Sequence, residues 1–368
     1  MRVLQVTPAF FPGIGGIETV VQELVIHLRR NGVESDVAHL SPGHASSRRD
    51  QMGDFTVFRV PLRPNRFIGV ASGLGQLFQD YDLIHVHDPQ LMAVSANVIL
   101  FGRGKKKVLS THGGYMHTSN HALFKRIHWG LVARPLLRQY DAILASGEQD
   151  FELYRSKAPH ARLIQNGVNV EKFDSIVRTS APCAARWIYW GRLSRNKRLD
   201  NLIASVGACR RSGLDVDLLV AGRDFDGLEP ALRAQIAELG LAEHVHIAGP
   251  LSDKELANEL ERRSVFVTAS EYEGFGLSLI EAMAAGLVVL CRDIPPMNGF
   301  VDDGKNGVFL SFDGGDEDLA ALKALCAKPE AELAAMQNNA RARAQAYGWK
   351  NAVQKFIAAY ENVLANRI

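Results

Sequence analysis

Residues 270–290, SEYEGFGLSLIEAMAAGLVVL, contain a loop, a helix and a strand in direct succession. The spacing of apolar residues predicts a helix over residues 277–285, and Gly286 is suited to end it. The wholly apolar residues 287–290 predict a strand that is buried on both faces. A helix followed at once by such a strand is typical of a parallel α/β sheet.

The same stretch holds two glutamates, Glu273 on the loop and Glu281 on the helix. Leu277, Glu281 and Ala284 fall at i, i+4 and i+7 and share one face, so Glu281 is expected where a core residue would lie. A buried carboxylate needs hydrogen-bond donors, and the adjacent hydroxyls of a ribose or a sugar would supply them. The alternative is a capping or surface glutamate, against which the helical phase argues.

Strands and helices alternate along the whole chain, which predicts parallel, doubly wound sheets. The first series has a helix at residues 19–30 and strands at residues 3–6, 35–40, 83–87, 108–111 and 142–146. The second series has helices at residues 200–211 and 230–239 and strands at residues 187–190, 217–221, 245–247 and 265–268. We therefore expect two similar α/β domains.

The domain boundaries follow from this restart of the pattern. Residues 1–170 form an N-terminal domain and residues 185–345 a C-terminal domain. Residues 171–184 have little apolar periodicity and are predicted to link them. The final helix, residues 346–368, could return to the N-terminal domain.

Composition excludes several classes of protein. The 368 residues are 47% hydrophobic, which suits large buried cores. The four cysteines are far apart and form no C-x-x-C pair, so neither a disulfide framework nor a zinc site is indicated. We expect a cytoplasmic protein without a signal peptide or membrane span, and any membrane contact would be peripheral.

Charge is uneven, with a net +6 over the first 170 residues and −4 over the rest. Residues 101–140 hold basic residues and no acidic one: Arg103, Lys105, Lys106, Lys107, Lys125, Arg126, Arg134 and Arg138. Trp129 and Phe124 lie among them. One interpretation is a surface that docks on anionic membrane or binds a phosphate-bearing acceptor. The other is a solvated helix face whose apolar residues belong to the core.

Open α/β sheets bind ligands beyond the carboxyl ends of their strands. After the first strand comes PGIGGIE, residues 12–18, a glycine-rich loop in which Gly15 and Gly16 could present backbone N–H groups to a phosphate. A dinucleotide fingerprint needs glycine at position 18, where Glu18 stands, and residues 38–40 contain no ribose-binding acid. A nicotinamide cofactor is therefore excluded.

Two further loops carry cations or a histidine. GRLSRNKRL, residues 191–199, places Arg192 and Lys197 around a turn before a helix, which suits a diphosphate, although exposed loop cations are equally common. His112 follows another strand and could donate to a sugar hydroxyl or a phosphate oxygen, although a lone histidine is more often structural.

Metal ligation is weakly indicated and we predict no metal site. His85 and His87 are two residues apart at a strand end, which is poor ligand spacing. Asp224 and Asp226 resemble the Asp-x-Asp of some metal-dependent sugar-nucleotide enzymes, but their position in a turn favours a structural role.

Taken together, these motifs resemble those of the family 4 retaining glycosyltransferases of the GT-B fold, over nearly the whole chain. The motifs that carry the resemblance are Glu273-x7-Glu281, His112-Gly113-Gly114, Asn166-Gly167-Val168, Gly191-Arg192 with Lys197, and Gly15-Gly16. STHGGYMHT from Ser110, AGRDFD from Ala221 and CRDIPPM from Cys291 are most similar to bacterial exopolysaccharide α-mannosyltransferases of the xanthan and acetan type. The resemblance implies two Rossmann-like domains that face each other across a cleft.

It also implies roles for particular residues. Glu281 would bind the ribose, Arg192 and Lys197 the diphosphate, and His112 and Glu273 the transferred sugar as catalytic residues. The remaining donor contacts would come from the backbone of the loops, at Gly15, Gly16, Gly274, Phe275, Gly276 and Leu277. AGRDFD departs from the family's Gly-x-Gly loop, which puts the base pocket in doubt.

The implied activity is metal-independent transfer of a hexose with retention. The donor would be GDP-mannose and the acceptor a polyprenyl-diphosphate oligosaccharide, with Arg103, Lys105, Lys106, Lys107, Lys125, Arg126 and Trp129 on the acceptor or membrane side. No cofactor beyond the nucleotide sugar and no nucleic-acid partner is expected. The alternatives are a UDP-sugar donor with a lipopolysaccharide or other acceptor, a GT-B epimerase or phosphorylase, and a non-catalytic sugar-nucleotide-binding subunit.

Overall fold

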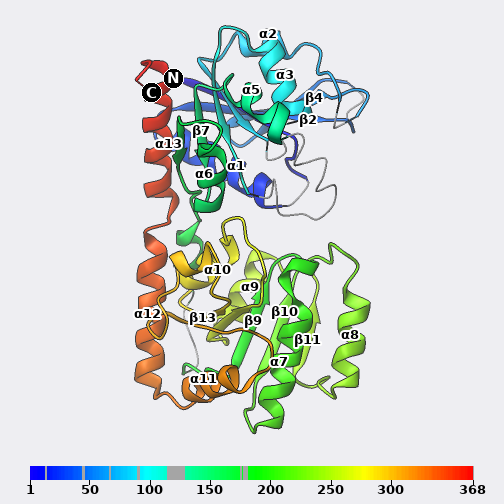
Figure 1. Ribbon diagram of the computed structural model, residues 1–368, viewed down its shortest axis with the longest axis vertical. Helices are drawn as coiled ribbons and strands as arrows, with labels where there is room; N and C mark the ends of the chain where they lie inside the picture. The colour runs from blue at the N-terminus through cyan, green and yellow to red at the C-terminus, as the bar shows by residue number, and fades with distance from the viewer. Residues whose placement is uncertain are drawn as a thin grey trace. The chain divides into compact units, whose positions relative to one another are not determined.

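The computed structural model describes residues 1–12, 15–43, 46–65, 68–88, 92–113, 129–174, 176 and 181–367. The chain divides into two compact units (Figure 1). The first contains residues 1–167 together with 349–368, and the second contains residues 168–348. The segment expected to link the domains, residues 171–184, belongs to the second unit, where Phe173 and Ile176 are buried in the core.

The first unit is built on an eight-stranded sheet in the order β3-β4-β2-β1-β5-β6-β7-β8. Every pairing is parallel except that of β3 with β4. The strands are β1 (Arg2–Thr7), β2 (Glu34–Ser41), β3 (Arg48–Met52), β4 (Phe55–Pro61), β5 (Leu83–His87), β6 (Lys106–Ser110), β7 (Ala142–Ala145) and β8 (Ala161–Leu163). The helices are α1 (Gly16–Arg30), α2 (Leu74–Phe78), α3 (Ala93–Phe101), the π-helix η1 (Trp129–Ala133), α5 (Arg134–Leu137), α6 (Glu148–Arg155) and α13 (Trp349–Leu364).

The second unit has a six-stranded, wholly parallel sheet in the order β11-β10-β9-β12-β13-β14. The strands are β9 (Arg186–Trp190), β10 (Asp217–Ala221), β11 (Val245–Ala248), β12 (Val265–Thr268), β13 (Val288–Cys291) and β14 (Gly307–Phe309). The α-helices are α7 (Leu199–Arg211), α8 (Glu229–Glu238), α9 (Asp253–Leu260), α10 (Leu277–Ala284), α11 (Asp316–Cys326) and α12 (Glu330–Gln345). The 3₁₀ turns are η2 (Val170–Phe173), η3 (Arg195–Lys197) and η4 (Met297–Gly299).

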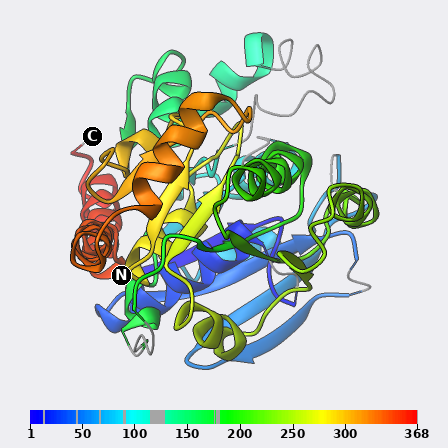
Figure 2. The same cartoon turned by 90° about the horizontal axis from the view of Figure 1, so that it is seen from below.

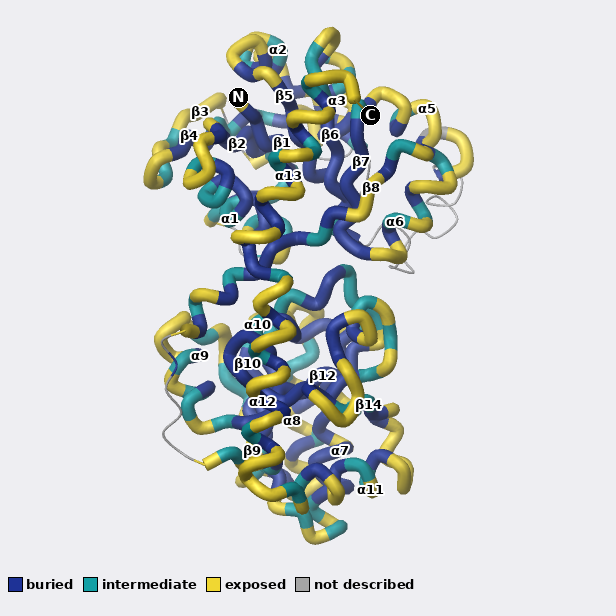
Figure 3. The backbone as a smooth tube through the Cα atoms, turned by 90° about the vertical axis from the view of Figure 1, so that its left-hand side faces the viewer, coloured by how far each residue is buried: buried dark blue, intermediate teal, exposed yellow. Residues whose placement is uncertain are grey.

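Both sheets carry helices on their two faces, as a doubly wound fold requires (Figures 1 and 2). The central strands are consequently buried, and the outer helix faces are exposed (Figure 3). The stretch that opened the analysis forms α10 and β13, and all four residues of β13 have no exposed surface. The prediction of two doubly wound α/β domains is confirmed.

Strand order reverses once in each unit, between β1 and β5 and between β9 and β12. At such a reversal the loops leave the sheet toward opposite faces and open a crevice at the carboxyl ends of the strands. The predicted site loops follow β1, β6, β9 and β12. Each unit thus has its own candidate ligand-binding edge.

The C-terminal helix α13 belongs to the first unit, as anticipated. One face of the helix is buried, at Trp349, Ala352, Val353, Phe356, Tyr360 and Val363. The Trp349 ring stacks on His27 of α1, with ring centroids 5.6 Å apart. A Cβ atom at Gly167 would lie 2.3 Å from the Trp349 ring, so only glycine fits beneath it. Helix α13 therefore contributes to the core of a domain whose other residues all lie at or before Gly167 in the sequence.

Strands β3, β4, β8 and β14 escaped the sequence-based prediction, although β4 is a seven-residue strand with buried apolar residues. Strand β3, RRDQM, is polar and partly exposed, and it pairs antiparallel with β4 at the edge of the first sheet. Charged residues are common on such edges because they discourage pairing with another chain. Strands β8 and β14 have only three residues each, too few to show a periodic pattern.

Candidate active site

Two loops meet at the carboxyl edge of the second sheet. The first loop, residues 191–198, follows β9, and the second, residues 270–276, follows β12. Strands β9 and β12 are hydrogen-bonded neighbours, so the loops leave the sheet side by side. We call them the lysine loop and the glutamate loop, after Lys197 and Glu273.

Lys197 and Glu273 form an ion pair between the Lys197 Nζ and Glu273 Oε1 atoms. The hydroxyl of Ser270 donates to the same carboxylate oxygen at 2.8 Å. The two charged side chains are only 10% and 11% exposed. The structure thus brings together two residues that the sequence assigned separately to the diphosphate and to the sugar, and it holds each by the charge of the other.

Arg192, the second cation of the lysine loop, is not buried in an ion pair as Lys197 is. Its side chain is exposed, and its guanidinium stands 5.0 Å from the centroid of the Phe225 ring. Within the described part of the chain, no carboxylate pairs with it. The backbone carbonyl of Arg192 accepts a hydrogen bond from the Tyr189 hydroxyl at 2.8 Å. Because the backbone is held while the guanidinium remains unneutralised, Arg192 is available to an anionic ligand.

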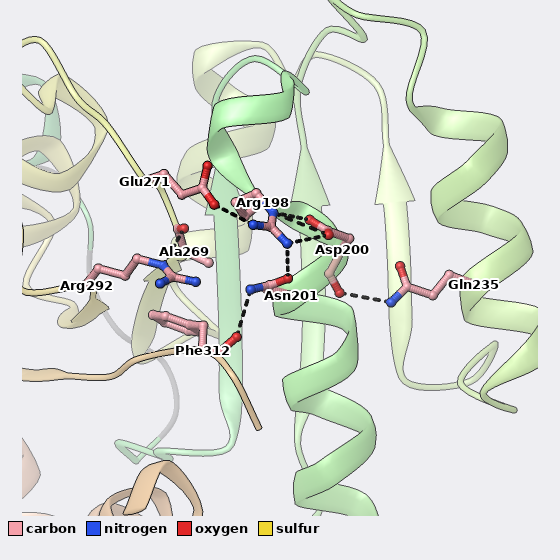
Figure 4. Close-up of polar contacts among 8 residues, drawn as sticks. All are labelled: Arg198, Asp200, Asn201, Gln235, Ala269, Glu271, Arg292 and Phe312. Atoms are coloured by element: carbon pink, nitrogen blue, oxygen red, sulfur yellow. Dashed lines mark hydrogen bonds and ion pairs between the residues drawn. The ribbon is translucent and has the colours of Figure 1, made fainter. Parts of the chain in front are cut away.

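Further hydrogen bonds connect the lysine loop to the glutamate loop. The sequence analysis did not predict them. The Glu271 amide donates to the Asn196 carbonyl at 2.9 Å, and the Asn196 side chain donates to the Tyr272 carbonyl at 3.1 Å. Arg198 donates to Glu271 and also to Asp200 at 3.0 Å (Figure 4). The hydrogen bonds to Asp200 and then Glu271 raise the pKa of Arg198.

Arg198 makes these contacts from a left-handed backbone conformation, with φ at +47°. Such a conformation is uncommon for a residue with a side chain. Asn201 of α7 accepts from the Arg198 guanidinium at 2.8 Å and donates to the Phe312 carbonyl at the same distance (Figure 4). No sequence pattern pointed to Arg198, because its partners lie up to 73 positions away.

Helix α10 begins directly after the glutamate loop. Gly276 caps it at φ +83°, and a Cβ atom there would lie 3.2 Å from the Met297 sulfur. Phe275 is buried in the core, whereas Gly274 and Leu277 are half-buried. The N–H groups of the first turn of α10 therefore lie next to Glu273 at the same edge of the sheet.

Glu281, in the middle of α10, is half-buried. Its Oε2 atom accepts a hydrogen bond from Trp190 Nε1 at 3.2 Å. Trp190 is the last residue of β9, so Glu281 lies close to the carboxyl end of that strand. The expectation of an inward-facing, hydrogen-bonded glutamate agrees with this geometry, while the ribose contact stays a prediction.

The acidic and histidine pairs weighed as metal ligands have other partners. Asp224 accepts hydrogen bonds from the backbone amides of Leu228 and Glu229, at 2.8 and 3.0 Å, where α8 begins. Asp226 accepts from the Arg195 amide at 2.9 Å. Among the described residues no group of three or more His, Cys, Asp or Glu side chains is arranged to hold a metal ion.

In the first unit, His112 follows β6 in a left-handed conformation, φ +60°. Its neighbours hold it there, since the Thr111 hydroxyl and the Gly113 amide both donate to the Asp150 carboxylate. His112 Nε2 lies 2.7 Å from His87 Nδ1. Burial lowers the pKa of His112 to about 4, so the ring is neutral near pH 7. Gly114, the third residue of the motif, lies outside the described residues.

The glycine-rich loop leads into α1. Gly15 precedes the helix and Gly16 is its first residue, three positions earlier than predicted. A Cβ atom at Gly15 would lie 2.7 Å from Glu18 Oε2, so the carboxylate of Glu18 folds back over the loop. The loop therefore presents the N-terminus of a 15-residue helix.

In the basic stretch, residues 101–140, one predicted membrane-facing residue is buried instead. Trp129 is 7% exposed and packs edge-on against Tyr154 in the core, so its assignment to a membrane surface is wrong. The lysines at the start of β6 bind neighbouring groups: Lys105 the carbonyls of Gln79 and Tyr81, Lys106 the side chains of Asp141 and Asn366, and Lys107 the carbonyls of Gly102 and Lys105. Arg103 is exposed, whereas Lys125 and Arg126 lie outside the described residues.

Two doubly wound sheets with polar loops at the reversal of strand order are shared by many classes of protein, and sequence comparison identifies this one as a glycosyltransferase. Residues 14–172 match the profile of Glycosyltransferase Family 4, and residues 184–343 match that of Glycosyl transferases group 1. The chain belongs to the family 4 glycosyltransferases, and it is a hexosyltransferase with the GT-B fold. The resemblance stated from the sequence motifs is confirmed.

Individual relatives match over nearly their full length. The GDP-mannose:cellobiosyl-diphosphopolyprenol alpha-mannosyltransferases of Xanthomonas campestris and Komagataeibacter xylinus are 28% and 29% identical, over 99% and 100% of this chain and 97% and 95% of their own. The D-inositol 3-phosphate glycosyltransferase of Nocardiopsis dassonvillei is 30% identical over 99% of this chain and 94% of its own. Among solved structures, sucrose-phosphate synthase from Thermosynechococcus elongatus superposes with a TM-score of 0.77 at 21% identity, over the whole of both chains.

Proposed function

We propose that this glycosyltransferase moves mannose from GDP-mannose onto a polyprenyl-diphosphate-linked oligosaccharide in exopolysaccharide synthesis. The full-length similarity to enzymes named for that donor and acceptor supports the proposal. The observation that carries the chemistry is the meeting of the lysine and glutamate loops at one edge of a sheet. Arg192 and Lys197 bind the diphosphate, Glu281 the ribose, and Glu273 and His112 the mannose.

The leaving diphosphate needs positive charge, and the chain can supply it without a metal ion. Arg192 has no carboxylate partner in the described residues, and the first turn of α10 adds N–H groups at the same edge. We therefore propose metal-independent transfer, with the nucleotide sugar as the sole co-substrate. Activity is expected to survive excess EDTA. Loss with chelator and recovery with Mn²⁺ or Mg²⁺ would refute this.

Retention of configuration does not require a carboxylate nucleophile here. Retaining glycosidases use two carboxylates about 5 Å apart, one of which attacks the sugar. In this chain Glu281 bonds to Trp190, and Glu273 is paired with Lys197. We propose front-face attack, in which the departing diphosphate takes the proton of the acceptor hydroxyl while Lys197 and Arg192 stabilise its charge.

The donor base can be tested first. A nucleotide that binds only the folded protein raises its stability by about 2.7 kcal/mol at 100 times its Kd. Thermal shift measurements with GDP, UDP and ADP should show the largest stabilisation with GDP. Stabilisation by UDP alone would instead indicate a UDP-sugar donor. Transfer of radiolabelled mannose to a cellobiosyl-diphosphopolyprenol acceptor then tests the complete reaction.

A lipid-linked acceptor requires access to a membrane, and no helix among the described residues is long and apolar enough to cross one. We propose peripheral attachment to the inner face of the cytoplasmic membrane through the end of the basic stretch. Leu131 is 73% exposed, and Arg134 and Arg138 are exposed on the turns that follow it. An apolar side chain beside two cations suits an anionic lipid surface, where each cation contributes about 1 kcal/mol.

Vesicle flotation tests this attachment. Wild-type protein should float with anionic but not with zwitterionic vesicles and should detach as salt rises. The Arg134→Gln/Arg138→Gln variant should float less. A matched control, Lys323→Gln/Lys328→Gln, removes the same charge from the second unit and should float normally. Equal flotation of both variants would exclude this surface.

A further inference from the structure

A chain of hydrogen bonds runs through the interior of the first unit and ends at His112. Gln5 of β1 and His87 of β5 have no exposed surface. Gln5 Nε2 donates to the Ser35 hydroxyl at 3.0 Å, and Gln5 Oε1 lies 2.8 Å from His87 Nε2. His87 Nδ1 in turn lies 2.7 Å from His112 Nε2. Three adjacent strands and the loop after β6 thus share one polar path.

The two imidazoles are neutral. Burial lowers the pKa of His87 well below its ordinary value and that of His112 to about 4. A neutral imidazole carries one N–H donor and one acceptor nitrogen. In a series of hydrogen bonds between such groups, the donor at one end determines which nitrogen of each following imidazole carries the proton. Two facing lone pairs or two facing protons would repel.

The donor-to-acceptor direction of these hydrogen bonds follows from the orientation of the Gln5 side-chain amide. Its amide nitrogen faces Ser35, so its oxygen faces His87 and accepts. His87 Nε2 must then carry the proton, and His87 Nδ1 is left as an acceptor. His112 consequently carries its proton on Nε2 and donates to His87. The Nδ1 atom of His112 keeps its lone pair.

The orientation of His112 is held independently through its backbone. Thr111 and Gly113, on either side of it, both donate to Asp150, which is 4% exposed. Within the described part of the chain, the Nδ1 atom of His112 has no protein partner. His112 as a whole residue is half-buried.

We propose that Gln5 and His87 are positioning residues that hold His112 in the Nε2–H tautomer, so that its Nδ1 atom accepts a hydrogen bond from a hydroxyl group of the transferred sugar. This assignment reverses the donor role expected for His112 from the sequence. The contact with the sugar rests on the proposed function, whereas the tautomer is a property of the ligand-free protein.

A neighbouring histidine provides a control. His85 lies beside His87, with ring centroids 4.2 Å apart, but its nitrogens lie 2.8 Å from the Tyr360 hydroxyl and 2.8 Å from the Ser110 hydroxyl. Ser110 is buried on β6, next to the His112 loop. Tyr360 is also hydrogen-bonded to Gln5, so His85 is connected to the path through Tyr360. Ser110→Ala therefore removes a buried hydrogen bond of the same kind without changing a direct contact of Gln5, His87 or His112.

The tautomer can be measured directly by NMR on protein labelled with ¹⁵N in its 12 histidines. Spectra of His87→Asn and His112→Asn variants assign the two rings. In ligand-free wild type, both rings should show a protonated Nε2 and an unprotonated Nδ1. A protonated Nδ1 on His112 would overturn the proposal whatever the substrate is.

Kinetics test the role of that tautomer. Gln5→Leu removes the acceptor that faces His87 and should lower kcat about tenfold, which corresponds to about 1.4 kcal/mol, with the GDP affinity unchanged. Ser110→Ala should retain wild-type kcat.

The two experiments separate the possible failures. If no nucleotide sugar is turned over, the proposed function fails while the NMR result still decides the tautomer. If the tautomer is as expected but Gln5→Leu and wild type share the same kcat, the positioning role is refuted. An equal loss of kcat in Gln5→Leu and Ser110→Ala would point to general loosening of the core and would also refute it.

Discussion

The two candidate ligand-binding edges differ in how they hold their side chains. Around His112, buried groups are neutral and linked through Gln5 and His87 by hydrogen bonds whose direction matters. Around Lys197, the partners are ions, and the Lys197–Glu273 contact depends on charge. An ionic site suits a diphosphate that departs with negative charge, and a neutral site suits hydroxyl groups. The difference predicts different responses to substitution and to pH.

The largest effect on stability and activity is expected from removing Glu273 from its ion pair with Lys197. Glu273→Ala leaves the Lys197 charge buried without its partner, which typically costs about 3 kcal/mol of stability. Transfer should fall by more than a hundredfold, because the proposed contact of Glu273 with the sugar is lost as well. Chemical denaturation and steady-state kinetics measure the two losses.

The double variant Glu273→Ala/Lys197→Met separates stability from activity. Removing both charges should recover most of the stability, because no unpaired ion remains. Activity should stay low. Recovery of activity in the double variant would exclude both residues from the donor site.

The next largest effect is expected from acid, which should lower the folding stability that depends on the buried, neutral histidines around His112. Burial lowers the pKa of His112 to about 4, and burial also lowers the pKa values of His85 and His87. Between these values and the ordinary histidine pKa near 6.5, the unfolded chain binds more protons than the folded one. Stability from these groups is therefore full above about pH 6.5 and is lost as pH falls, by about 2 kcal/mol at pH 5 for His112 alone.

Denaturant unfolding at pH 7 and pH 5 checks this expectation, with His112→Asn as the comparison. The variant should lose less stability on acidification than wild type. An identical pH dependence would mean that His112 is not held neutral by the fold.

A smaller effect is expected from Glu281, which accepts a hydrogen bond from Trp190 at the carboxyl end of β9. Glu281→Ala removes the proposed ribose contact and should weaken GDP binding about tenfold, or 1.4 kcal/mol. The kcat at saturating donor should change little. Calorimetry with GDP provides the measurement, and wild-type affinity in the variant would remove Glu281 from the ribose site.

The smallest effect on stability and on donor KM is expected from Arg198, whose ion pairs are partly exposed to solvent. Arg198 is 33% exposed, so its ion pairs with Glu271 and Asp200 contribute at most about 1 kcal/mol. Arg198→Gly removes them but suits the left-handed backbone, so stability should hardly change while KM for the donor rises a few-fold. Arg198→Lys should restore part of the KM. An unchanged KM in the glycine variant would show that the loops keep their positions without Arg198.

Local patterns in the sequence were enough to predict the doubly wound domains, because buried parallel strands are nearly continuous apolar runs and α10 and β13 follow one another without a break. They also select the candidate site loops, because ligands of open α/β sheets bind where strands end, and the roles of these loops stay predictions. The polar edge strand β3 and the three-residue strands β8 and β14 were missed because neither type carries a periodic apolar signal. Strand β4 was missed although it contains apolar residues.

The sequence by itself determined the kinds of residue at each site: a carboxylate on either side of a glycine elbow, two cations on one loop and a histidine after a strand. Only the tertiary structure decided their states. Lys197 and Glu273 neutralise each other across 76 positions, Trp129 is buried, and Gln5 sets the proton of His112 through His87. Protonation, pairing and burial depend on neighbours in space, and the sheet brings those neighbours together from strands far apart in the chain.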